Sequence, residues 1–122
     1  MSSVEIMRLL SQPSEIVQAD AILSIAVAVA VPMDSPQLFV QAHAVSVGIG
    51  GNARVCGLTM VEVRNGISDF RKLRVSLPEH SQAAQLQLAF SLWAVVRGKL
   101  QRLDAISATS RPFIVAGKSF LC

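Results

Sequence analysis

An apolar run at residues 21–31, AILSIAVAVAV, restricts the folds open to this chain more than any other segment. A membrane-spanning helix needs about 20 predominantly apolar residues, whereas this shorter run is bounded by Asp20 and Pro32. Leu, Ile and Val alternate with Ala and Ser, which places the larger side chains on one face of an extended strand. The small residues on the other face allow a second layer to approach closely. The run therefore predicts a central strand with both faces covered.

Alternating apolar residues also predict strands at 37–49, 54–66 and 70–77, and a short closing strand within 112–122. The Gly-rich residues 48–51 and the dipeptide Asn65-Gly66 separate these segments. Such residues favour hairpin turns, because glycine and asparagine tolerate a positive φ. The middle of the chain is therefore expected to form successive antiparallel strands.

Two segments have helical periodicity instead. From Ser81 to Ala108, apolar residues recur every three or four positions, at Leu86, Ala89, Trp93, Val96, Leu100 and Leu103. This spacing predicts a long amphipathic helix over about 81–108, weakened at Gly98. Near the N-terminus, Ser2 and Glu5 fit a capping box for a short helix that Pro13 ends. The expected fold class is α+β: an antiparallel sheet of four to five strands packed by one long C-terminal helix, with a short N-terminal helix, in a single domain of residues 1–122.

The composition is apolar and the charge is unevenly distributed. The chain is 52% hydrophobic and only 16% charged, which favours burial of part of its apolar surface in a subunit interface or on lipid. An ordinary monomer rich in Ala and Val is the alternative. Residues 1–53 contain one basic and four acidic residues, whereas residues 54–122 contain ten basic and four acidic ones. This asymmetry favours a basic face for nucleic acid or acidic lipid.

No pattern typical of catalysis or metal binding is present: the sequence has no HExxH, CxxC or nucleophile-elbow motif, and its acidic residues are scattered. His43 is expected to be a hydrogen-bonded core or interface residue, and His80 to belong to a turn. Cys56 and Cys122 are too few for a disulfide framework and are expected to be free thiols in a reducing compartment. The sequence therefore predicts a protein that is not an enzyme and has no cofactor and no metal.

Basic residues gather at two places. Three lie on the predicted strand 70–77 and three in the second half of the predicted helix: Arg71, Lys72 and Arg74, and Arg97, Lys99 and Arg102. Because Leu73, Val75 and Leu77 are expected to face the core, Lys72 and Arg74 should project outward. Aromatic residues are scarce, so nucleic acid would be contacted through its phosphates. These six residues are the predicted binding site for RNA or anionic lipid, with a merely solvated face as the alternative.

Residues 70–100 resemble the last strand and main helix of the small matrix proteins of bornavirus-type negative-strand RNA viruses. The matching positions are Phe70-Arg71-Lys72 in the strand, Pro78-Glu79-His80 in the turn, Ala89-Phe90 in the helix, and Arg97 with Lys99 near its end. The resemblance covers about a quarter of the chain. It implies a small β-rich domain with a packed helix, which self-associates, coats the inner face of a viral envelope and binds RNA or nucleocapsid.

These observations predict a non-enzymatic, matrix-type viral structural protein that self-assembles and binds anionic membrane or RNA through its basic residues. Its expected partners are copies of itself, RNA or nucleocapsid, and an anionic membrane surface. The resemblance implies a location in the virion or the host cell interior, on the cytoplasmic face of a membrane. Acidic residues precede the 21–31 run, unlike in a secretory signal, so the protein is not expected to be secreted. Two alternatives stay open: a capsid or coat protein of a small RNA virus or phage, and a small ligand-binding or accessory domain.

Overall fold

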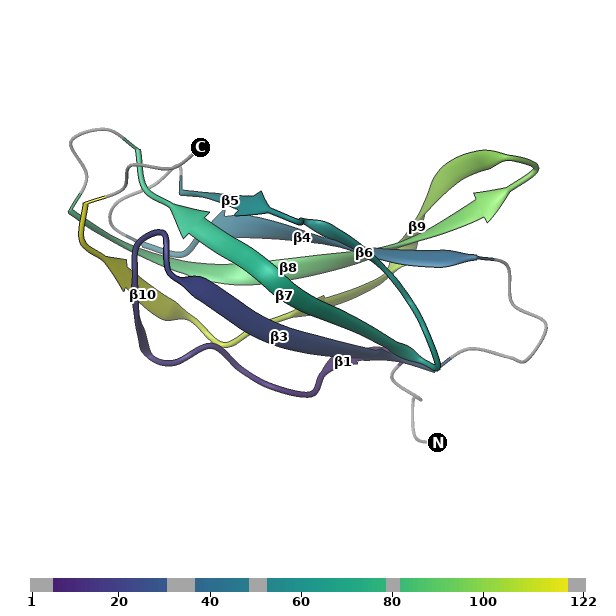
Figure 1. Ribbon diagram of the computed structural model, residues 1–122, viewed down its shortest axis with the longest axis horizontal. Helices are drawn as coiled ribbons and strands as arrows, with labels where there is room; N and C mark the ends of the chain where they lie inside the picture. The colour runs from purple at the N-terminus through teal and green to yellow at the C-terminus, as the bar shows by residue number, and fades with distance from the viewer. Residues whose placement is uncertain (1–5, 31–36, 49–52, 79–81, 119–122) are drawn as a thin grey trace.

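Two β-sheets packed face to face make up the part of the chain that the computed structural model describes, which is residues 6–30, 37–48, 53–78 and 82–118 (Figure 1). No helix occurs within these residues. The strands are β1 (Met7–Leu9), β2 (Ile16–Gln18), β3 (Ile22–Val29), β4 (Leu38–Ser46), β5 (Arg54–Gly57), β6 (Met60–Glu62), β7 (Ile67–Ser76), β8 (Ala83–Val96), β9 (Lys99–Thr109) and β10 (Phe113–Ala116). The predicted α+β class is therefore wrong, and the fold is all-β.

The first sheet has four strands in the order β1-β3-β7-β5. The second has six, in the order β2-β10-β8-β4-β6, with β9 paired to β8 on the same edge as β10. All pairs are antiparallel except β2 with β10, which are parallel. Beyond Leu38, where β4 begins, the β8–β9 hairpin projects from the body of the sandwich (Figure 1). We call residues 93–102 of this hairpin the arm.

The long helix predicted over 81–108 is a β-hairpin. Its inward residues recur at every second position, and Ala84, Leu86, Leu88, Phe90, Leu92 and Ala94 are all buried. Of the six residues that suggested a helical stripe, only Leu86 belongs to the core. Arg97 and Gly98, both with positive φ, form the two-residue turn that joins β8 to β9, as a type I′ hairpin requires. The prediction followed a coincidental helical spacing in a segment where every second residue from Ala84 to Ala94 turns inward.

Other predictions are confirmed or corrected in detail. The short N-terminal helix is wrong where the structure describes that segment, because Met7–Leu9 pairs with β3 as a strand. The 21–31 run is a central strand as expected, with Leu23, Ile25, Val27 and Val29 buried, but its Ala and Ser face is not covered by another layer.

Asn65-Gly66 forms the expected hairpin turn. The predicted strand 54–66 is two strands that lie in different sheets, β5 and β6.

One hydrophobic core fills the space between the sheets, built from the inward residues of both. At its centre, Phe70 of the four-stranded sheet and Phe90 of the six-stranded sheet are fully buried, with ring centroids 5.4 Å apart and planes tilted by 59°. Tilted aromatic pairs at this separation add stability beyond their buried area. This contact lies between the two sheets. Because their inner faces are buried against each other, the outer faces are the surfaces available for binding.

Candidate anion-binding surface

The outer face of the four-stranded sheet collects basic side chains from three strands. The register places Arg8 beside Ala28 and Ile67, and Arg74 beside Ile22 and Cys56. Residues directly opposite each other in adjacent strands share a face of the sheet. The five basic residues on this face are Arg8, Arg54, Arg71, Lys72 and Arg74, and we call them the basic face. Among the described outward positions of this face, one residue is acidic, Asp69.

A β-bulge at the centre of β7 makes the basic face denser. Leu23 is opposite Leu73 and Ile25 is opposite Phe70, so Arg71 and Lys72 together face the single residue Ser24. Because one extra residue is inserted, the two residues that flank the bulge point to the same face of the sheet, and the two residues within it point to the opposite face. Phe70 and Leu73 both enter the core, and Arg71 and Lys72 are both exposed. The expected inward direction of Leu73, Val75 and Leu77 is confirmed, since all three are buried.

Arg74 differs from its neighbours because it is half-buried. Its Nε atom is shielded from solvent and has no hydrogen-bond partner among the described residues. A shielded guanidinium N–H without a partner costs free energy, and an anionic acceptor offsets that cost better than a neutral one. Arg74 is therefore the position on the basic face that gains most from a bound anion.

The second predicted cluster lies elsewhere. Arg97, Lys99 and Arg102 are carried by the arm, which belongs to the six-stranded sheet. Arg97 occupies the turn, and Arg102 forms an ion pair with Asp104 at 3.6 Å. The structure therefore separates the six predicted residues into two groups on different sheets. The structure adds Arg8 and Arg54 to the basic face. The sequence does not predict them there, because their position in the same sheet as β7 depends on the order of the strands.

A groove of about 520 Å³ runs between β6 and β7. Two ion pairs line it, Glu62–Arg64 at 3.1 Å and Asp69–Arg71 at 2.8 Å, together with the exposed apolar side chains of Leu58 and Ile67. Hydrogen bonds from Gln37 and Arg64 lower the pKa of Glu62, so this carboxylate stays ionised. Each of these two carboxylates is therefore already paired with an arginine of its own segment of the chain.

The outer face of the six-stranded sheet carries a hydrogen-bonded cluster. Trp93 Nε1 donates to Ser91 Oγ at 3.1 Å, and His43 Nε2 lies 3.1 Å from the same oxygen. The Ser91 hydroxyl can donate its hydrogen to an unprotonated Nε2. Burial first, and the positive charge of Arg102 second, lower the pKa of His43 below its ordinary value of 6.5. The expected hydrogen-bonded role of His43 is confirmed; His80 lies outside the described residues.

His43 should make the stability of the protein depend on pH. Because its pKa is lower in the folded state, the unfolded chain binds a proton at this residue first. The contribution of neutral His43 to the free energy of unfolding is fully present above pH 6.5. It is lost progressively as the pH falls toward the pKa of His43 in the folded state. We expect the urea midpoint of the wild type to fall between about pH 7.5 and 5.5. The same fall should be smaller in His43→Gln; identical pH dependence in both proteins would show that His43 is not its cause.

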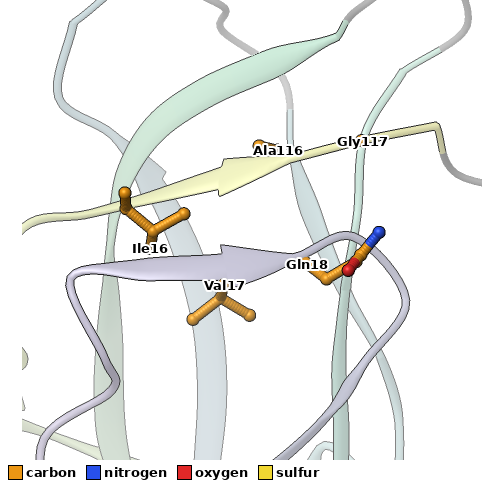
Figure 2. A pocket seen from close by; sticks show the side chains of 5 residues that line it. All are labelled: Ile16, Val17, Gln18, Ala116 and Gly117. Carbon is orange, nitrogen blue, oxygen red and sulfur yellow. The ribbon is translucent and has the colours of Figure 1, made fainter.

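A hollow of about 430 Å³ lies beside the parallel strands β2 and β10, lined by Ile16, Val17, Gln18, Ala116 and Gly117, none of which is charged (Figure 2). Within the described residues, no three His, Cys, Asp or Glu side chains come together as a metal site. No helix in that part of the chain has the length and apolar character that a membrane crossing requires.

Cys56 also corrects an expectation. It lies half-buried opposite Arg74 and is disulfide-bonded, so the prediction of a free thiol there is wrong. Cys122, the other cysteine of the sequence, lies outside the described residues.

Comparison with known proteins finds no relative: no protein-family model and no curated protein matches the chain.

Proposed function

We propose that this is a non-enzymatic, matrix-type structural protein that binds the anionic surface of a membrane through the basic face. The observation that carries the proposal is the gathering of five basic residues and one acidic residue on one face of a sheet. A cluster of this kind attracts anionic headgroups, and each Lys or Arg near the surface contributes about 1 kcal/mol. The viral setting implied by the resemblance of residues 70–100 is part of this proposal.

Two properties of the basic face favour lipid over RNA. Its described outward positions contain no aromatic side chain on which a base could stack. They do contain Ile22 and Ile67, both exposed; Ile22 lies opposite Arg74, and Ile67 lies opposite Ala28, which in turn is opposite Arg8. Apolar side chains set among cations suit the boundary between headgroups and acyl chains, where burial of the apolar group adds to the electrostatic attraction.

The test is flotation of the full chain with phosphatidylcholine vesicles, with and without phosphatidylserine. The wild type should bind only the anionic vesicles, and less at high salt. Arg8→Gln with Lys72→Gln removes two exposed charges from two strands and should weaken binding about thirty-fold, since each contributes about 1 kcal/mol. The fold should be nearly unaffected, because exposed substitutions change stability by about 0.5 kcal/mol or less. Lys72 is chosen over Arg74 because Arg74 is half-buried.

The matched control is Arg97→Gln with Lys99→Gln, which removes one arginine and one lysine from the arm. This variant should bind anionic vesicles as the wild type does. Equal weakening in both variants would show that net charge, not the basic face, is responsible. Absence of wild-type binding to anionic vesicles at low salt would refute the proposal, and a shift of single-stranded RNA under the same conditions would replace the membrane by RNA phosphates as the partner.

A further inference from the structure

The arm joins the sandwich at an irregularity in β9. Ser91 of β8 is opposite Ser107, whereas the next residue of β8 is opposite Leu103. Residues 104–106 are therefore inserted into β9 without a paired residue on β8, and strands bend and twist at such insertions. On the arm side of the insertion, β9 packs against the core through Leu103, which is only half-buried. Residues 104–106 are thus the place at which the β9 side of the arm can move.

A polar cluster from three strands lies beside this insertion. The Ser91 hydroxyl of β8 accepts a hydrogen bond from Trp93 Nε1, and it also lies 3.1 Å from Nε2 of His43 in β4. Arg102 of β9 is opposite Trp93. Ser91 is only 2% exposed although it lies on the outer face of the sheet, so neighbouring side chains exclude water from it. The charge of Arg102 acts on His43 across this cluster.

The other groups around His43 are uncharged or paired elsewhere. On β8 and β4, the surrounding outward residues are all uncharged: Gln41, Val45, Gln87, Ala89 and Ser91. The charged residue of β6 is Glu62, which is paired with Arg64. On β9, Asp104 forms an ion pair with Arg102, but both side chains are more than half exposed, and exposed ion pairs contribute little. β5 and β7, which also approach β4, belong to the other sheet and do not face His43.

A proton on His43 would disturb the cluster in two ways. A protonated imidazole donates from both nitrogens, so the Ser91 hydroxyl loses the acceptor that Nε2 provides. The new charge also faces that of Arg102 at a partly buried site, where salt screens repulsion less than at the surface. Burial and the charge of Arg102 hold the pKa of His43 below 6.5. Moving Arg102 away relieves the repulsion, so proton binding and a displaced β9 favour each other.

We propose that His43 is a pH-sensitive switch for the arm: its protonation moves residues 99–103 of β9 away from Trp93, with the bend at residues 104–106. At neutral pH, His43 is unprotonated and Arg102 stays opposite Trp93. In acid, Arg102 moves outward and the indole of Trp93 becomes more exposed to solvent. This inference goes beyond the proposed membrane binding and does not depend on it.

The experiment follows the fluorescence of Trp93, which is the only tryptophan of the chain and therefore reports on the arm. The full chain is titrated from about pH 8 to about pH 5 without denaturant. In the wild type, the emission maximum should shift to longer wavelength and quenching by acrylamide should increase, with a midpoint below pH 6.5. The far-UV circular dichroism should stay constant, because the strands of the sandwich remain paired.

Two pairs of variants identify the groups responsible. His43→Gln can still form a hydrogen bond to the same hydroxyl but takes up no proton, so the shift should disappear. Its control, His80→Gln, should shift as the wild type does. Arg102→Gln removes the repelling charge and should reduce the shift, whereas its matched control, Lys99→Gln, removes a cation nearer the tip of the arm and should keep the full shift. The second pair tests the proposal even if His43→Gln fails to fold.

An emission maximum that does not move with pH, that moves equally in His43→Gln, or that no longer moves in His80→Gln would overturn the proposal. So would equal shifts in Arg102→Gln and Lys99→Gln. Loss of the far-UV signal together with the fluorescence shift would show that acid unfolds the whole sandwich, and would also overturn it. Vesicle flotation is carried out at neutral pH, so either proposal can fail without the other.

Discussion

Replacing Phe70 by alanine should lower the free energy of unfolding by about 3–5 kcal/mol, the usual cost of deleting a fully buried phenylalanine side chain. Phe70 has no exposed surface and contacts Phe90 across the two sheets. The substitution removes this contact and leaves a cavity that the rigid sheets on either side cannot close. Folded domains are stable by only about 5–15 kcal/mol, so the loss is a large part of the total. Urea unfolding followed by Trp93 fluorescence measures it.

The control for this prediction is Phe70→Leu, which keeps most of the side-chain volume and should cost less than about 1.5 kcal/mol. A small effect of the alanine substitution would contradict the central position of Phe70 in the core. Because Phe70 also belongs to the segment that was predicted correctly as a strand, the experiment tests the packing of the two sheets and not the assignment of β7 itself.

The second large effect is expected at Gly57, where the chain leaves the four-stranded sheet after β5. Its φ is +84°, and a Cβ atom built there would lie 2.0 Å from the carbonyl oxygen of Lys72. That oxygen accepts a hydrogen bond from the Leu58 N–H at 3.3 Å. Gly57→Ala must therefore move β5 away from β7, in addition to the cost of about 1–2 kcal/mol for a left-handed backbone. We expect the variant to lose several degrees in Tm or to fail to fold.

Gly98→Ala is the matched control for this substitution. Gly98 has a similar φ of +76°, but nothing lies within 4 Å of the position that its Cβ would occupy. It should therefore show only the backbone cost of about 1–2 kcal/mol. Thermal unfolding of the two variants separates the steric contribution from the conformational one. Equal losses would show that the close approach of β5 to Lys72 does not constrain the fold.

Local alternation determined a large part of the strand structure. Residues 21–31 predicted β3 because their inward side chains are Leu, Ile and Val at every second position, and 70–77 predicted β7 for the same reason. Asn65-Gly66 predicted its turn because few residues other than these tolerate the positive φ that a two-residue hairpin needs. These signals act over a few residues and do not depend on what packs against them.

The helix prediction failed where two periodicities overlapped. Residues 83–96 contain apolar side chains at both helical and alternating spacings, and propensity alone does not choose between them. Pairing with β4 along nine positions and with β9 along eight decided in favour of the strand, because each pairing satisfies backbone groups and buries Leu88 and Phe90 against the other sheet. Arg97-Gly98 was the local signal that could have corrected the error.

The basic residues of β7 could be predicted from the sequence, but the basic face could not. Alternation alone showed that Lys72 projects outward, whereas the bulge that also exposes Arg71 exists only because β3 and β7 pair with shifted register. Arg8 and Arg54 join them because β1 and β5 lie in the same sheet as β7, and the order of strands is set by packing between distant segments. For β3 and β7 the sequence by itself determined that the residues are extended and that Leu23, Ile25, Val27, Leu73 and Val75 turn inward, since this follows from local sterics and hydrophobicity. Only the tertiary structure decided which outward side chains share a face, because that depends on pairings between residues far apart in the chain.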